Sequence, residues 1–310
     1  MAHPLVDFIT AFDPLDLIRI APPLGWLPYA RIALGGEPEP VSEPRLEDRD
    51  PAFIARFFEG FWWFAQRYFR HRVFGVEHVP ASGAALIVGN HSGGLTATDW
   101  ALTLAAIYKA HGPERAVHGL GHDLLQWHPV LRKYSRKLGG LRAGHQAALE
   151  VFARGRLALV YPGSDFDSFR PFSERDRVVF AGRTGFMELA LRAQVPIIPV
   201  ATAGAQEQYV VFTRGEKLAE LLDLKRRLRS NVAPIGFSIP WGFGPTYLPY
   251  IPLPAQITTA FLPPMSWPEL GPEAADDPAI VRRCCDEVEA ALQTRLDALT
   301  LGRVPWLGQC

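Results

Sequence analysis

The chain has 310 residues, of which 48% are hydrophobic and 21% charged, and its 32 basic side chains balance its 32 acidic ones. This composition is typical of a globular protein with a sizeable core, and the zero net charge gives no reason to expect a nucleic-acid partner. The three cysteines, Cys284, Cys285 and Cys310, lie late in the chain. Adjacent cysteines rarely bridge, so we expect no disulfide framework and a reducing cytosol.

The first 72 residues predict a helical N-terminal region. Residues 1–36 favour short apolar helices interrupted by APPLGWLP, and residues 37–50, EPEPVSEPRLEDRD, predict an acidic, proline-rich loop. Apolar and aromatic residues recur at helical spacing in residues 51–72, which predicts an amphipathic helix. The start of the chain lacks the basic region of a signal peptide, and no window holds the roughly 20 continuous apolar residues of a transmembrane helix.

Strand and helix patterns alternate after residue 72. The predicted strands are 84–90, 114–121, 157–163, 195–204 and 255–264, and the predicted helices are 99–112, 123–140, 144–155, 183–194, 215–230 and 276–300. Such alternation favours an α/β fold with a largely parallel central sheet flanked by helices. We therefore expect one domain over residues 73–310, preceded by the N-terminal helical extension.

A segment without any charged side chain, Ser230–Pro268, contains nine prolines. Because proline breaks helices, this segment predicts an irregular apolar surface or a membrane-dipping loop rather than a spanning helix. The basic sequence KRRLRS precedes it, and an anionic bilayer attracts such a cluster. We expect peripheral attachment on the cytoplasmic side of a membrane through Trp241 and Phe243. Trp62 and Trp63 either share that contact or pack on the domain, the commoner fate of an aromatic stripe.

The stretch VGNHSGGLTATDW places His91 directly after the predicted strand 84–90. Functional groups of α/β folds gather at the carboxyl ends of strands. Asp99 opens the next helix, where its carboxylate can accept a hydrogen bond from one imidazole nitrogen and leave the other as a base near neutral pH. That arrangement suits removal of a proton from an alcohol that attacks a carbonyl. The alternative is a loop histidine beside a helix cap, with no function.

Other candidate sites have weaker patterns. His118, His122 and His128 are spread over a strand, a turn and a helix, so their spacing does not favour zinc, and we expect no metal. Ser92 and Ser164 each lack the full Gly-x-Ser-x-Gly pattern of a nucleophile elbow. A serine esterase with Ser92 as its nucleophile remains an alternative.

Four blocks in order carry a resemblance over about residues 70–265: VGNHSGGLTATDW, LGGLRAGHQAALEVFARGRLALVYPGSDFDSFRPF, GRTGFMELALRAQVPIIPV and LPYIPLPAQITTAFLPP. Together they resemble the glycerolipid acyltransferase superfamily, which includes the 1-acylglycerol-3-phosphate acyltransferases, and are nearest its diacylglycerol-acyltransferase-like branch. The resemblance implies that His91 is the general base and that Asp99 orients it. It also implies direct acyl transfer from acyl-CoA or acyl carrier protein to a hydroxyl of a lipid acceptor, in bacterial lipid biosynthesis, without metal or cofactor.

The chain departs from the family pattern in two places. Seven residues separate His91 from Asp99, where the family usually has four, so the insertion loops out or Asp99 is not the partner. The family's Pro-Glu-Gly-x-Arg block reads YPGSDFDSFR here, with Gly163 and Ser164 at the Glu and Gly positions.

The resemblance also implies a set of substrate-binding groups. Backbone groups around Gly163 and Ser164 would bind the acyl donor or the developing oxyanion. Phosphate groups would be held by Arg170, Arg142 and Arg183, because guanidinium groups bind phosphate through paired hydrogen bonds. The displacement of these arginines from their usual places favours a neutral or unusual lipid acceptor. A non-catalytic lipid-binding protein on the same scaffold remains an alternative.

Overall fold

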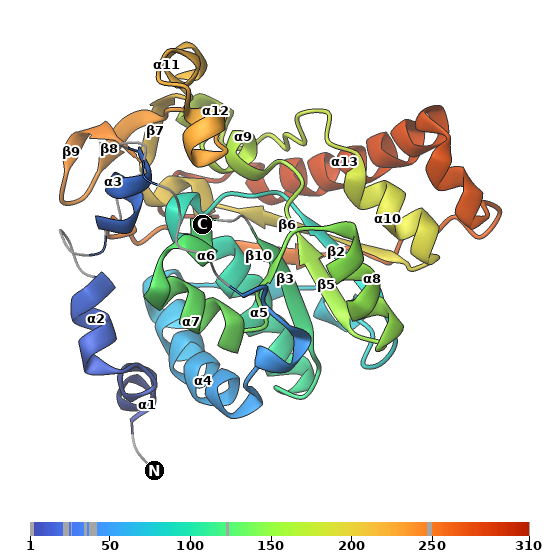
Figure 1. Cartoon of the computed structure of the whole chain (residues 1–310), viewed down its shortest axis with the longest axis horizontal. Coiled ribbons are helices and arrows are strands. Elements are labelled where there is room, and N and C mark those ends of the chain that lie inside the picture. The colour runs from blue at the N-terminus through green and yellow to red at the C-terminus, as the bar shows by residue number, and fades with distance from the viewer. Residues whose placement is uncertain are drawn as a thin grey trace.

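A mixed sheet runs through the centre of the molecule (Figure 1). The structure, a computed structural model, describes residues 3–20, 25, 27–33, 36, 42–121, 124–246 and 250–309. Within these residues the sheet has seven strands, in the spatial order β1 (Arg72–Phe74), β10 (Thr258–Phe261), β6 (Ile197–Ala203), β2 (Ala85–Gly89), β5 (Leu157–Val160), β3 (Val117–Gly121) and β4 (Leu141–Arg142). The last five strands of that order are mutually parallel, whereas β10 is antiparallel to β6 and parallel to β1. The predicted α/β class with a largely parallel sheet is confirmed.

Helices cover both faces of this sheet. In chain order the α-helices of the described residues are α1 (Pro4–Thr10), α2 (Pro14–Ile20), α3 (Leu27–Ala33), α4 (Pro51–Tyr68), α5 (Thr98–His111), α6 (Leu124–Trp127), α7 (Pro129–Lys137), α8 (His145–Ala153), α9 (Ser164–Ser168), α10 (Gly185–Ala193), α11 (Glu216–Leu221), α12 (Leu224–Leu228) and α13 (Pro278–Thr300). Helices α4, α5 and α7 pack on one face, and α8, α10 and α13 pack on the other.

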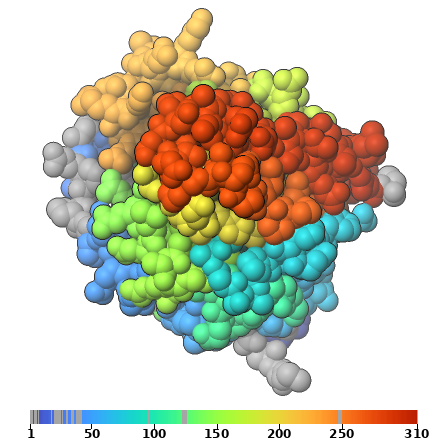
Figure 2. Space-filling view, turned by 90° about the vertical axis from the view of Figure 1, so that its right-hand side faces the viewer, coloured from blue at the N-terminus to red at the C-terminus, as the bar shows by residue number. Residues whose placement is uncertain are grey.

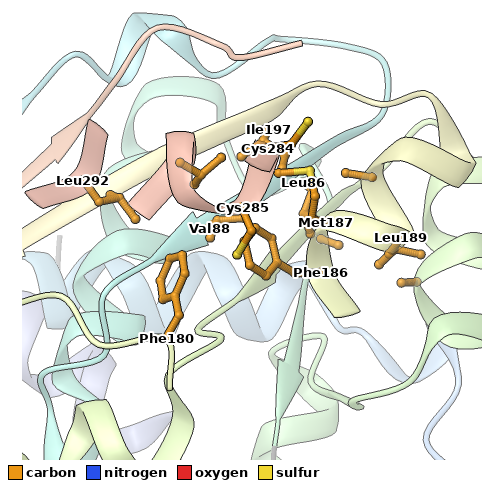
Figure 3. Packing of buried hydrophobic residues seen from close by; sticks show 14 of the residues in the cluster. Leu86, Val88, Phe180, Phe186, Met187, Leu189, Ile197, Cys284, Cys285 and Leu292 are labelled. Atoms are coloured by element: carbon orange, nitrogen blue, oxygen red, sulfur yellow. The ribbon is translucent and has the colours of Figure 1, made fainter. Parts of the chain in front are cut away.

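Strand β2 lies between these two helical layers, and all five of its residues are buried. Leu86 and Val88 belong to the core under α13, whereas the alternate residues Ala85 and Ile87 belong to the core under α4 and α5. A parallel strand covered on both faces needs this continuous apolar run. Figure 3 shows Cys285 of α13 next to Val88, and Figure 2 shows the outer side of α13, in orange-red, at the molecular surface.

Two predicted helices are each divided in the structure. Helix 123–140 is interrupted at His128, which is extended at φ −91° and ψ 120°, because the residue before a proline is disfavoured in the helical region. Helix 215–230 is interrupted at Asp223, which has a left-handed backbone with φ 51°. The sequence predictions of single continuous helices were wrong at these two points.

The charge-free segment is more regular than its proline content predicts. Strands β8 (Ile235–Ser238) and β9 (Gly242–Pro245) join β7 (Val210–Thr213) in a small antiparallel sheet with the order β7-β8-β9. Of the prolines next to this small sheet, Pro234 and Pro240 flank β8 and Pro245 ends β9, where a missing N–H is tolerated. Among the described residues, no helix has the length and apolarity needed to cross a bilayer.

The aromatic stripe of α4 packs on the domain. Phe53, Ile54 and Phe58 are buried in the core under α4 and α5. Trp62 is half-buried with its ring 5.9 Å from the ring of His71, and the guanidinium of Arg67 lies 4.2 Å over the half-buried ring of Trp63. Both tryptophans contact protein groups, as in the packing alternative, and a membrane contact through their exposed parts stays a prediction.

Leu292→Ala should lower the free energy of unfolding by about 2–5 kcal/mol, because a fully buried leucine of α13 would leave a cavity against the sheet. Urea denaturation measures this change. Arg283→Ala on the same helix is the control: its side chain is 58% exposed, and its loss should change stability by less than about 0.5 kcal/mol. Equal losses for both variants would contradict the assigned packing of α13.

Candidate active site

The loop that carries His91 is anchored to the end of the sheet by Asn90. The Asn90 side-chain amide donates to the carbonyl oxygen of Thr202 on β6 at 3.0 Å, and its carbonyl oxygen accepts from the Thr202 amide at 2.8 Å. Asn90 has no exposed surface. The pair of hydrogen bonds extends the pairing of β2 with β6 by one residue and fixes where His91 leaves the sheet.

The insertion between His91 and Asp99 forms a compact turn. A 3-10 turn at Gly94–Thr96 is followed by Ala97 in the left-handed region, φ 45°, and then α5 begins. Asp99 therefore returns to His91: its Oδ2 accepts from His91 Nδ1 at 2.7 Å and from the amide of Ser92 at 2.7 Å. The position of Asp99 in the first turn of α5 also favours its negative charge.

Gly93 allows this turn to close. A Cβ atom at residue 93 would lie 2.4 Å from the amide nitrogen of Thr98 and 2.5 Å from Oδ1 of Asp99. Neither neighbour can withdraw, because one is backbone and the other belongs to a buried carboxylate. The glycine is thus required by space rather than by its φ, which is −97°.

The pairing with Asp99 leaves one imidazole nitrogen available. Because a carboxylate accepts at Nδ1, the proton of neutral His91 is on Nδ1 and the lone pair is on Nε2. In the described part of the chain no group is within hydrogen-bond distance of Nε2. The His91 side chain is 18% exposed, whereas that of Asp99 is fully buried. The ring of Tyr161 stacks on the imidazole with centroids 4.9 Å apart.

The environment sets the basicity of His91. Burial by itself lowers the pKa of His91, but the charge and hydrogen bond of Asp99, together with the charge of Asp167, outweigh burial and the opposing charge of Arg170. The net result is a pKa above the usual 6.5. His91 therefore binds a proton more strongly than a free imidazole does, which strengthens it as a base.

A buried ion pair holds the backbone of His91 from the other side. Arg170 and Asp167, both with fully buried side chains, bond to each other through Nη1 and Oδ1. The His91 amide donates to Asp167 Oδ2, and the His91 carbonyl oxygen accepts from Arg170 Nη1 at 2.8 Å. Burial raises the pKa of Asp167 to about 6, against the lowering effect of the Arg170 charge and the His91 amide.

Arg170 is placed differently from what a phosphate contact requires. Besides its bonds to His91 and Asp167, its Nη2 donates to Ser92 Oγ at 3.0 Å and its Nε donates to the carbonyl oxygen of Arg175 at 3.2 Å. All three guanidinium nitrogens therefore have protein acceptors, and none has exposed surface. Its geometry is that of a residue that positions the active-site loop.

Ser92 lies in the same buried network. Its Oγ accepts from the Asn90 side-chain amide at 3.0 Å and from Arg170, and the residue is 1% exposed. Among the described residues, no imidazole nitrogen is within hydrogen-bond distance of this oxygen. A serine nucleophile needs both an activating base and access to the substrate, so this geometry favours His91 over Ser92 as the reactive group.

Gly163 and Ser164 lie at the end of β5, beside the strand that precedes His91. A Cβ at residue 163 would lie 2.2 Å from the carbonyl oxygen of Val179, and the Ser164 amide donates to the Tyr161 carbonyl oxygen at 3.1 Å. Arg183 donates to the Gly163 carbonyl oxygen and to Asp165 Oδ1, the latter at 2.8 Å. The predicted binding of donor or oxyanion by these groups stays a prediction.

The remaining predicted residues lie away from His91. Arg142 ends β4, the third strand beyond β2, which corresponds to about 14 Å across the sheet, and it pairs with Glu43 at 3.0 Å. His118 donates to the Gly139 carbonyl oxygen through Nδ1, and His128 caps α7, while His122 lies outside the described residues. No group of metal-ligating side chains occurs in the described ranges.

The chain is similar to a family model and to several known proteins. The family model described as Acyltransferase matches residues 70–203, which include β2, His91 and Asp99. An uncharacterised protein of Mycobacterium leprae is 30% identical over 255 residues, covering 82% of this chain and 67% of its own length. The DGAT1/2-independent enzyme synthesizing storage lipids of Bos taurus is 25% identical over 139 residues, 45% of this chain and 40% of that enzyme. The chain belongs to the glycerolipid acyltransferase superfamily.

Two further matches show how much of the chain, and of each similar protein, is covered. An uncharacterised protein of Mycobacterium tuberculosis is 32% identical over 241 residues, and the match covers 78% of this acyltransferase-family chain but 64% of the longer relative. The crystal structure of the 1-acyl-sn-glycerophosphate acyltransferase of Thermotoga maritima shares 17% identity with a TM-score of 0.48, covering 96% of this chain and 98% of that one.

Two residues of the site, Asp167 and Tyr161, were not predicted from the sequence. Asp167 stands three residues before Arg170, a spacing that brings side chains together on a helix and could have indicated the pair. Tyr161 directly follows β5, which pairs with β2, so the residues after both strands meet at one edge of the sheet. Strand adjacency was the missing information in the second case.

Asp99→Asn should lower the pKa of His91, because the substitution removes the charge that raises it. NMR titration of the ¹³C-labelled imidazole should give a His91 pKa above 6.5 in the wild-type protein and a lower His91 pKa in Asp99→Asn. The spectrum of His91→Gln assigns the resonance. Unchanged titration in Asp99→Asn would show that the two side chains do not interact in solution.

Proposed function

We propose that the chain transfers a fatty acyl group from a thioester to the hydroxyl of a lipid acceptor, with His91 as the general base. The observation that carries this proposal is the short Nδ1–Asp99 hydrogen bond, which leaves a partly exposed Nε2 with its lone pair. Family membership supports the reaction class. The donor, acyl-CoA or acyl carrier protein, is proposed on the family alone.

The reaction follows from this geometry. His91 Nε2 takes the hydroxyl proton while the acceptor oxygen attacks the thioester carbonyl and forms a tetrahedral intermediate. Collapse of the intermediate breaks the carbon–sulfur bond, and the imidazolium returns the proton to the leaving thiolate. Asp99 stabilises the imidazolium formed between these steps, and no acyl-enzyme intermediate is needed. Asp167 and Arg170 hold the His91 backbone, which matters because small misplacements of a base are costly in rate.

A neutral acceptor, such as a mono- or diacylglycerol, fits the arginines best. Arg170 has no free donor, Arg142 is bound to Glu43, and Arg183 is bound to the Gly163 carbonyl and to Asp165. A phosphate-bearing acceptor would need guanidinium groups that face the site. The name of the mammalian relatives, which refers to storage lipids, gives additional support.

His91→Ala should reduce acceptor-dependent acyl transfer by about 10²–10⁴-fold, the usual contribution of a general base. Thiol release and lipid product are followed with a long-chain acyl-CoA and a panel of diacylglycerol, monoacylglycerol, a long-chain alcohol, glycerol 3-phosphate and lysophosphatidate. His145→Ala, which removes an exposed histidine at the start of α8, is the matched control and should retain activity.

The outcomes separate the alternatives. Thiol release that needs no acceptor would indicate a hydrolase instead of a transferase. Preference for glycerol 3-phosphate or lysophosphatidate would contradict the neutral acceptor while leaving the base in place. Bound lipid or acyl-CoA without turnover would favour a binding protein on this scaffold.

The small sheet β7-β8-β9 offers a surface for the membrane that holds such lipids. Phe212, Phe237 and Phe243 lie on one face of it, with exposed fractions of 56%, 44% and 75%. Phe237 is paired in register with Phe243, whose ring lies 5.8 Å from that of Phe212. The opposite face of the sheet is buried through Val211. Trp241, predicted as a second contact, is half-buried beside it.

The charges and the apolar helices next to the phenylalanine face of this sheet support a lipid bilayer as its binding partner. Helix α12 beside this sheet carries Lys225, Arg226 and Arg227, which an anionic lipid surface attracts. Helix α3 contacts α12, and Figure 1 shows α1, α2, α3 and β9 along one side of the molecule. Five large apolar side chains of these N-terminal helices are at least half exposed: Val6, Ile9, Leu15, Ile18 and Leu27. We therefore propose peripheral docking through this side.

Phe243→Glu should weaken binding to anionic liposomes by about tenfold or more, because burying a phenylalanine is worth about 1.5–3 kcal/mol. Flotation with phosphatidylglycerol-containing vesicles at low salt measures it. Phe74→Glu is the matched control, since Phe74 is 48% exposed on the edge strand β1 of the central sheet. Equal loss in both variants, or a wild-type protein that never floats, would refute this docking face.

A further inference from the structure

A cavity lies at the edge of the central sheet opposite to the edge that carries His91. It has a volume of about 580 Å³ and is lined by Ala81–Gly83 before β2, Glu114–Ala116 before β3 and Arg154–Arg156 before β5. Leu46, Glu47, Arg49 and Pro51 near the start of α4 and His111 at the end of α5 complete the lining. These segments precede the strands, whereas His91 follows β2. The five residues of β2 separate the two edges by about 16 Å. The cavity is therefore distinct from the acyl-transfer site.

Arginine dominates the cavity lining. Arg49, Arg115, Arg154 and Arg156 contribute four positive charges against two from Glu47 and Glu114, one of which is already bound to Arg154. Among the described residues, no carboxylate is within ion-pair distance of the other three arginines. The lining therefore carries a positive charge that the protein itself leaves without a counter-charge.

Arg115 is held rigidly in the lining. It is 8% exposed, and its Nε, Nη1 and Nη2 donate to the carbonyl oxygens of Pro80 at 2.9 Å, Gly155 at 3.0 Å and Gly83 at 2.6 Å. Each Nη carries a second N–H. Burial lowers the pKa of Arg115, which is the electrostatic cost of a buried cation with no anion beside it.

Two further nitrogen atoms of the lining lack partners. Arg49 Nε and His111 Nε2 are buried and have no hydrogen-bond partner in the described residues. Buried polar groups are almost always satisfied. Both atoms are fully buried, so a ligand in the cavity would be held by the arginine guanidinium groups rather than by these two nitrogens.

His118 fixes the last arginine. Its Nδ1 lies 3.1 Å from the Gly139 carbonyl oxygen and its Nε2 lies 3.2 Å from Arg156 Nη1, so His118 is the neutral tautomer that donates to Gly139 and accepts from Arg156. Burial, with the charges of Arg156 and Arg49, lowers the pKa of His118 to about 4. His118, for which the sequence predicted no metal-binding role, thus orients a guanidinium at neutral pH.

We propose that this arginine cavity, lined by Arg49, Arg115, Arg154 and Arg156, binds a phosphate-bearing ligand. Guanidinium groups match phosphate oxygens in pairs and are preferred where the site is partly desolvated. The volume is that of a site for a small molecule rather than for a single ion. The inference is independent of the acyl-transfer proposal, because no residue is shared with the His91 site.

Isothermal titration of the full chain with pyrophosphate tests the proposal. One molecule should bind per chain, and Arg49→Gln with Arg156→Gln should weaken binding by about 10–100-fold, because two charge-assisted hydrogen-bond donors are lost. The matched control is Arg192→Gln with Arg282→Gln, which removes two exposed, ion-paired arginines of α10 and α13 and should leave affinity unchanged. Hydrogen exchange of the wild-type protein provides a readout that needs no variant: pyrophosphate should protect residues 81–83 and 154–156.

Two more probes distinguish the source of the phosphate. Tighter binding of adenosine diphosphate than of pyrophosphate would identify a soluble nucleotide. Tighter binding of a soluble short-chain phosphatidate than of pyrophosphate, lost in the cavity double variant, would identify a lipid headgroup. Absence of binding at about 10 mM of every probe, equal affinity of wild type and cavity variant, or protection elsewhere in the chain would each overturn the proposal.

Discussion

The carboxylate of Asp99 holds the active site together, because one buried oxygen accepts two N–H groups from consecutive residues. The hydrogen bond to His91 Nδ1 selects the tautomer, and the hydrogen bond to the Ser92 amide fixes the backbone from which that imidazole projects. Ring and backbone are thus oriented by the same atom. A buried polar network of this kind is sensitive to the loss of any member, since each partner would otherwise be left without a hydrogen bond.

The Asp167–Arg170 pair completes the constraint from the opposite side of the loop. Asp167 accepts from the His91 amide while Arg170 donates to the carbonyl oxygen of the same residue. A buried ion pair is costly to desolvate and is not by itself a source of stability. Its value here is geometric: the backbone of His91 is bonded on both its N–H and its C=O, so the imidazole has a fixed starting point.

How much of this could be predicted from sequence depends on how far apart the cooperating residues lie. The apolar runs of β2, β5 and β6 and the position of His91 after a strand are local patterns, and they predicted the class of fold and the edge at which the site lies. The compact closure of the insertion depended on the space at Gly93, which only coordinates reveal. Arg170 was predicted as a ligand for phosphate because its type suits that role, but sequence does not show that the protein uses all its donors. The four arginines of the arginine cavity come from three separate segments of the chain, and only the strand order brings those segments together.

The reversed direction of β10 determines which segment of the chain lies beside the His91 loop. Because β10 runs against β6, Thr258 at its start pairs with Ala203 at the end of β6. The chain that precedes β10 therefore arrives at the same edge as His91, and Tyr250 in that chain donates to the carbonyl oxygen of Gly93 at 2.8 Å. A single reversed strand thus connects the small sheet β7-β8-β9 to the loop that carries His91. A displacement of that sheet would pull on the Gly93 carbonyl through Tyr250, so the outer surface of the molecule and the His91 loop are mechanically coupled.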